Sequence, residues 1–121
     1  MEYASEKRIE SKALAGVWFT IARMSFGRRI ELTRRIWELA GRVEQLDAGG
    51  DARGKLEAAL VAAEIDRIYL SWGLTQIEGL TIDGEQATTE LVSAQGPEAL
   101  CREVVAAIKA ECGLTAEEVK N

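Results

Sequence analysis

Six arginines lie between residues 23 and 42, and this run is where the sequence could do charge-based chemistry. Only two glutamates accompany them, so the segment carries a net charge of +4 in a chain whose total is −5. Guanidinium groups gathered on one helix face bind the phosphates of nucleic acids. Uneven charge of this kind also suits a surface for an anionic protein or for a second copy of the chain.

The spacing of the acids argues for self-paired arginines. Glu31 stands three residues before Arg34 and four before Arg35, and Glu38 stands four before Arg42. Opposite charges at these spacings meet on one helix face and stabilise it by a few tenths of a kcal/mol per pair, about 0.2–0.5. The acidic chain as a whole also repels phosphate. We therefore predict a solvated helix face and no nucleic-acid binding, with three arginines lacking an acid partner in their own helix: Arg23, Arg28 and Arg29.

Catalytic chemistry has little to draw on in this chain. The sequence contains no histidine, which removes the usual general base and the common serine and cysteine dyads. Glu64 and Asp66 are two residues apart in a predicted helix, so their carboxylates do not face each other. No glycine-rich segment has the spacing of a phosphate-binding loop. We expect no enzyme activity, and we assign no catalytic, cofactor-binding or metal-binding residue.

The two cysteines, Cys101 and Cys112, fall in one predicted helix. Eleven residues of helix separate their Cα atoms by about 16 Å. A disulfide requires a Cα separation below about 7 Å, so we expect two free, buried thiols. The polar start of the chain lacks the apolar core of a secretory signal, and no apolar run is long enough for a membrane span, so a cytoplasmic location is expected.

The segment 17–23, within "GVWFTIAR", is predicted to be a strand because its residues alternate between two faces. Both faces are largely apolar, which suits either a buried strand or a surface that docks an extended partner. The residues before it, 1–15, are charged and polar, and we expect a flexible arm there. The two predicted faces are Val17, Phe19 and Ile21 on one side, and Trp18, Thr20 and Ala22 on the other.

Two long helices are predicted after this strand, at 26–46 and 52–72, and the short turn between them makes them antiparallel neighbours. Ser25 and Asp51 are the expected N-caps. The first helix carries an apolar stripe at spacings of four and three: Leu32, Ile36, Leu39, Val43 and Leu46, widened by Ile30 and Trp37. The second presents a broad apolar face: Leu56, Leu60, Ala63, Ile65, Ile68, Tyr69 and Trp72.

The last third of the chain contains strong turn signals. In the stretch 79–88, Asp83-Gly84 lies between alternating residues and predicts a type I′ hairpin. A short helical turn is expected from Thr88 or Thr89, followed by a helix that starts at Pro97 and ends near Gly113. A capping-box spacing at 115–118 predicts one final turn. The buried face expected for the helix after Pro97 is Leu100, Val104, Ala107 and Ile108.

These elements together predict a mainly helical α+β fold. Three longer helices pack with a small antiparallel β element, made of the N-terminal strand and the β-hairpin, in a single globular domain over 16–121. A lone hairpin is marginal in water, so we expect it to pack on a helix or to pair with the first strand.

Three stretches give the chain a resemblance to a known family: "SFGRRIEL" opening a long helix, "YLSWGLTQIEGLTIDGEQAT", and "GPEALCREVVAAIKAECGLTAEEVKN". With the preceding strand, they resemble the tail assembly chaperones of long-tailed phages and prophages over roughly residues 14–121. The resemblance implies a non-enzymatic, mainly helical cytoplasmic protein that binds the tape measure protein, helps to recruit tail tube subunits and often self-associates. The alternatives are a structural virion or head–tail connector component and, third, a small nucleic-acid-binding regulator.

For a chaperone of this kind, the sequence places the partner-binding surface on the strand and the adjoining start of the first long helix. The strand is apolar on both faces, and it adjoins the arginines that lack acid partners. The predicted partner-binding residues are Val17, Trp18, Phe19, Ile21, Arg23, Arg28 and Arg29.

Overall fold

The computed structural model describes residues 1–113, apart from the side chains of Glu38 and Asp47. The predicted turn at 115–118 lies outside the described residues. Within the described part the fold is mainly helical α+β, as the sequence predicts, with three longer helices and short antiparallel strands. No helix in 1–113 combines the length and apolar content that crossing a membrane requires.

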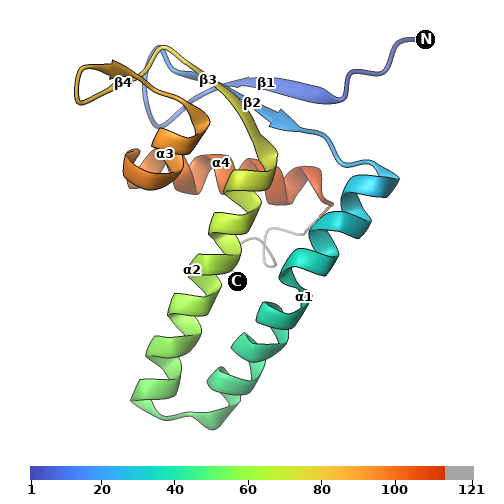
Figure 1. Ribbon diagram of the computed structural model, residues 1–121, viewed down its shortest axis with the longest axis vertical. Helices are drawn as coiled ribbons and strands as arrows, with labels where there is room; N and C mark the ends of the chain where they lie inside the picture. Colours follow the sequence, from blue (N-terminus) through green and yellow to red (C-terminus); the bar gives the residue numbers. More distant parts are fainter. Residues whose placement is uncertain (114–121) are drawn as a thin grey trace.

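A three-stranded antiparallel sheet forms one layer of the molecule (Figure 1). Its strands are β1 (Glu6–Glu10), β2 (Trp18–Ala22) and β3 (Leu74–Glu78), and β2 lies in the middle. The prediction of a flexible arm over 1–15 is therefore wrong for residues 6–10, which pair along the whole of β2. The charged β1 side chains do not prevent this pairing, because β1 is an edge strand whose residues are exposed except for the partly buried Ile9.

Helices α1 (Phe26–Gly49) and α2 (Ala52–Gly73) form an antiparallel hairpin that runs away from the sheet, with its connecting turn at the far end (Figure 1). The hydroxyl of Ser25 accepts a hydrogen bond from the N–H of Arg28 at the start of α1. The Asp51 carboxylate likewise accepts from the N–H of Gly54 at the start of α2. Both predicted N-caps are confirmed.

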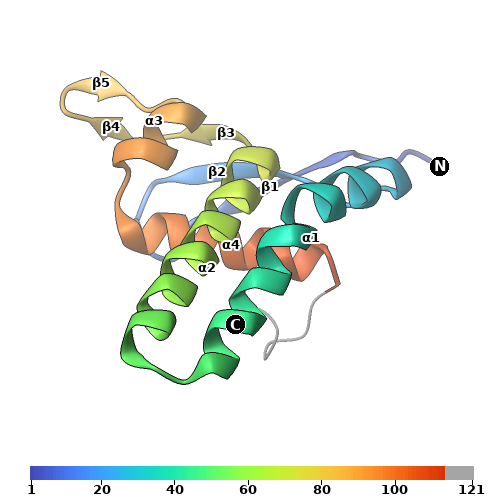
Figure 2. The ribbon, with the colours of Figure 1, turned by 60° about the horizontal axis from the view of Figure 1, so that its bottom comes forward.

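The end of α2 passes into β3 without a loop, because Gly73 is the last helical residue and Leu74 the first of the strand. Helix α4 (Glu98–Glu111) crosses this junction and lies under the sheet (Figures 1 and 2). A Cβ placed on Gly73 would lie 2.6 Å from Cδ1 of Ile108. The missing side chain at Gly73 thus lets α4 approach the helix-to-strand junction closely.

The predicted hairpin is present as β4 (Thr81–Ile82) and β5 (Glu85–Gln86), followed by α3 (Thr89–Gln95). Asp83 and Gly84 both have positive φ, 52° and 83°, as a type I′ turn requires. Thr88 caps α3, as predicted. The hairpin does not join the sheet of β1, β2 and β3, however. Of the two expectations for the hairpin, pairing with the first predicted strand is therefore wrong.

The core lies between the sheet, α4 and the upper part of α2. Its largest fully buried side chains come from β2, α3 and α4: Phe19, Ile21, Val92, Leu100, Val104 and Ile108. Both cysteines are free thiols, as predicted, but only Cys112 is buried as expected, and Cys101 is partly buried.

The inward faces of the long helices differ from the prediction. Of the α1 stripe, only Leu32 is fully buried, and Trp37 is 76% exposed rather than packed. In α2, Leu56 and Leu60 are 73% and 63% exposed. The reason is geometric: the hairpin projects beyond the core, so within residues 1–113 each helix has one neighbour there and buries only a narrow strip. The fully buried residues in the lower half of α2 are smaller, Ala58 and Val61.

Gly79 and Gly84 make a matched pair for testing the turn that links β3 to the hairpin. Both have positive φ, but a Cβ on Gly79 would overlap the carbonyl oxygen of Gly16, whereas a Cβ on Gly84 would meet open space. Gly84→Ala should cost about 1 kcal/mol from the left-handed backbone alone. Gly79→Ala should cost about 1–3 kcal/mol more because of the overlap. Urea unfolding measures both, and equal losses would contradict the close approach of Gly79 to Gly16.

Candidate functional site

The apolar strand chosen from the sequence as the partner-binding surface is part of the core. Val17, Phe19 and Ile21 are 3%, 0% and 1% exposed. Strand β2 is hydrogen-bonded to β1 on one edge and to β3 on the other, so it has no free edge for an added strand. The assignment of these three residues to a partner surface is corrected by their burial: they hold the sheet against the helices.

Trp18 lies on the outer face of the sheet and is partly buried. The guanidinium carbon of Arg8, from β1, lies 4.1 Å from the centre of the Trp18 ring. Arg8 Nε also lies 2.8 Å from Glu78 Oε2 on β3, and this hydrogen bond holds the pKa of Glu78 below its usual value. Trp18 is therefore covered by Arg8, which bridges the two edge strands, and it contributes to the packing of the sheet.

Two of the three arginines without acid partners, Arg28 and Arg29, fasten the start of α1 to the rest of the fold. The guanidinium of Arg28 donates to the carbonyl oxygens of Ser5 and Arg23, at 2.8 and 2.9 Å. Arg29 donates to the carbonyl oxygen of Cys112 at the end of α4, at 3.2 Å. Arg23 is partly buried, and its Nε has no hydrogen-bond acceptor among the described residues. The contacts of Arg28 and Arg29 make these two side chains connectors between elements rather than a free basic patch.

The predicted ion pairs within α1 do not appear in the described part of the chain. No salt bridge joins Glu31 to Arg34 or Arg35 among the residues whose side chains are described. The predicted Glu38–Arg42 pair involves a side chain outside the described set. Arg34 and Arg35 are exposed, so the prediction of a solvated basic face is retained without its acid partners.

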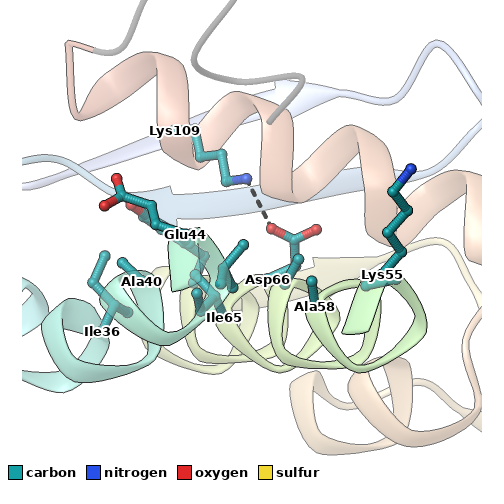
Figure 3. Close-up of a pocket in the computed structure, with 12 residues that line it drawn as sticks. Ile36, Ala40, Glu44, Lys55, Ala58, Ile65, Asp66 and Lys109 are labelled. Atoms are coloured by element: carbon teal, nitrogen blue, oxygen red, sulfur yellow. Dashed lines mark ion pairs between the residues drawn. The ribbon is translucent and has the colours of Figure 1, made fainter. Parts of the chain in front are cut away.

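A groove runs between α1 and α2 (Figure 3). Its volume is about 500 Å³, within the range of ligand-binding clefts. Small and branched apolar side chains make up most of its walls. Those from α1 are Ile36, Ala40 and Val43, and those from α2 are Ala58, Ala59, Ala62 and Ile65.

Charged groups mark the two ends of this groove (Figure 3). At the end nearer the sheet, Lys109 of α4 points to Asp66, with its Nζ 2.8 Å from Oδ1 and 5.3 Å from the Tyr69 ring centre. The Lys109 side chain is only 8% exposed, so Asp66 compensates a charge that water reaches poorly. Burial also raises the pKa of Tyr69. Towards the α1–α2 turn, the groove is flanked by Glu44 and Lys55.

The groove presents apolar side chains with charged groups beside them, a lining suited to binding a helix. The described residues contain no group of three or more His, Cys, Asp or Glu side chains placed to hold a metal ion. Eleven residues separate Lys55 from Asp66 along α2, a length of about 16 Å. Three turns of an apolar α-helix match that length, and the alanines of α2 allow a helix backbone to approach closely.

The sequence reading missed this groove because it weighted large apolar residues. Leu56 and Leu60 were assigned to the inward face of α2, while the alanines that line the groove were not considered. The signal that could have found the groove is the set of alanines at 58, 59 and 62. Their side chains are too small to fill the space between α2 and α1.

Comparison of the chain with protein-family models, with curated proteins and with solved structures finds no match. The resemblance to tail assembly chaperones therefore rests on the three sequence stretches alone.

The roles of Arg28 and Arg34 can be separated by stability measurements. Arg28→Ala removes two hydrogen bonds from a charged donor and should lower the free energy of unfolding by about 2 kcal/mol. Arg34→Ala is the matched control on the exposed face, where the change should stay within about 0.5 kcal/mol. Urea unfolding followed by circular dichroism measures both variants. If Arg28→Ala unfolds like the wild type, Arg28 is free for a partner and its connecting role is wrong.

Proposed function

We propose that this protein is a non-enzymatic phage or prophage tail assembly chaperone that binds a helical, apolar segment of the tape measure protein in the α1–α2 groove. In the bacterial cytoplasm it keeps that segment from aggregating and helps to recruit tail tube subunits. The identity of the partner comes from the sequence resemblance, and the groove supplies a surface suited to it.

The groove itself is the observation that carries the proposal. Helix α1 is 24 residues long, yet of its predicted apolar stripe only Leu32 is fully buried. The half-exposed remainder of the stripe includes Ile36 and Val43, which line the groove. An apolar helix laid along the groove would remove these side chains from water, a gain of roughly 25 cal/mol per Å² of apolar area buried.

The charged ends of the groove favour a partner that is apolar in the middle and polar at its flanks. Glu44 and Lys55 at the turn end have no salt-bridge partner within the described part of the chain, so each is available to a flanking residue of opposite charge. Lys109 and Asp66 already compensate each other and close the other end. A tape measure helix with an apolar stripe meets these requirements by the helix-in-groove mode of recognition.

A structural virion or connector component is the second candidate, since a helix-binding groove would also serve permanent assembly. The two functions differ in what becomes of the protein. A chaperone is absent or minor in the finished particle, whereas a connector stays in it, so protein analysis of purified particles separates the two.

Two exposed residues of α2 allow a paired test of the groove. Ala59 lines the groove, whereas Leu60, about 100° further round the helix and 63% exposed, does not. Ala59→Arg places a long charged side chain where the partner helix should lie, while Leu60→Arg places the same side chain away from the groove. In co-expression with the tape measure protein, Ala59→Arg should reduce the amount of tape measure protein kept in solution at least about tenfold, the effect of losing one interface contact of ~1.4 kcal/mol.

Both variants must first melt within a few degrees of the wild type by circular dichroism, because exposed sites tolerate such changes. With folding intact, equal solubilisation of the tape measure protein by both variants would remove the groove as the binding surface. Loss of solubilisation in Leu60→Arg alone would place the surface on the other side of α2.

A further inference from the structure

A second apolar feature of the hairpin lies outside the groove, on the exposed face of α1. Phe26, Ile30 and Trp37 are 87%, 44% and 76% exposed. Their spacings of four and seven place them on one face of the helix, and Gly41 continues the same row four residues on. An exposed row with two aromatic side chains is a typical interaction surface rather than a scatter of single apolar residues.

The spacing of the residues in this row is the same from either end. Its successive spacings, from 26 to 30, 37 and 41, are four, seven and four residues. When two such helices lie antiparallel about a two-fold axis centred between residues 33 and 34, position 26 of one copy meets position 41 of the other, and position 30 meets 37. Two-fold interfaces require this kind of self-complementarity, in which one patch on each copy contacts the same patch on the other.

From this row we propose that two copies of the chain pair through α1, antiparallel, with Phe26 of each copy seated over Gly41 of the other and Ile30 against Trp37. In this register the large side chain of Phe26 lies opposite a residue without a side chain, Gly41. A Cβ placed on Gly41 meets nothing within 4 Å, so the glycine leaves an open position opposite a large ring. The surface is hollowed at the same place, with a volume of about 620 Å³ bordered by Trp37, Gly41 and Glu44 among others.

Other registers lose this fit. Moving one helix by four residues towards its own N-terminus would set Phe26 against Trp37 but leave Ile30 against Thr33 and Gly41 beyond the start of the other α1. Moving it four residues the other way would set Trp37 against the charged Arg34. Only the centred register gives all three large side chains an apolar or empty position to pack on.

Charge supports the antiparallel direction. In the centred register, Glu44 lies opposite the segment just before the other copy's α1, which starts at Phe26. A helix N-terminus carries partial positive charge and favours a carboxylate there. A parallel arrangement would instead set the N-terminal halves, with Arg28 and Arg29, against each other.

This pairing rests on the exposed row and not on the proposed chaperone function, although Glu44 borders both the groove and the hollow beside the row. Sedimentation equilibrium should show a reversible dimer of the wild-type chain. Trp37→Ala removes a central aromatic anchor from both sides of a two-fold interface and should weaken the dimer at least about tenfold. Gly41→Gln fills the recess and should weaken it similarly, while leaving the helix at least as stable. Leu56→Ala, at an equally exposed position on α2, should leave the dimer unchanged.

Disulfide trapping tests the register. In Phe26→Cys/Gly41→Cys the two sites lie about 22 Å apart within one helix, too far for a bridge inside one chain. Mild oxidation should therefore link two chains. The control Phe26→Cys/Ala48→Cys carries the same substitution at Phe26 and keeps Gly41, but it moves the second thiol two turns along α1, and it should link much less. A monomer up to about 1 mM, or equal trapping in both variants, would overturn the proposal.

Discussion

The close contact between Gly73 and Ile108 is the constraint on which the rest of the structure depends. At Gly73 the chain changes from helix to strand in one step, and the missing side chain gives Ile108 of α4 its place at that step. The contact therefore fixes three things together: the direction of α2, the position of β3 and the crossing of α4. A side chain at residue 73 would overlap the side chain of Ile108, so Ile108 would have to move from its place at this junction.

The same constraint explains why the hairpin is only partly packed. Because α4 and the sheet hold the upper end of α2, the parts of α1 and α2 nearer their turn have, among the described residues, only each other as neighbours (Figure 1). Two helices side by side bury a narrow strip and leave their flanks open. On one flank this gives the groove along Ala59 and Ala62, and on α1 it gives the exposed row ending at Gly41. The core thus holds the hairpin in place, and the hairpin carries both surfaces that we propose contact other molecules.

The sequence predicts local features well and non-local ones poorly. The caps at Ser25 and Asp51 and the turn at Asp83-Gly84 were correctly predicted because each is encoded within a few residues. The strand at 6–10 was missed because its charged residues become a strand only through pairing with β2, a partner that composition does not reveal. The assignment of β2 to a partner-binding surface failed for a related reason. The alternation of β2 shows two apolar faces, and only the neighbouring strands decide that both are covered.

The central claim is that the α1–α2 hairpin contacts partners, whereas β2 does not. Hydrogen–deuterium exchange, compared between the free protein and its complex with the tape measure protein, tests this claim most directly. Amide exchange should slow in the groove-lining turns of residues 36–43 and 58–66, where bound helix would exclude water and suppress opening. Exchange in 18–22 should be unchanged, since these amides are already in the sheet core. Slower exchange confined to β2 and β1, with the hairpin unaffected, would contradict the account.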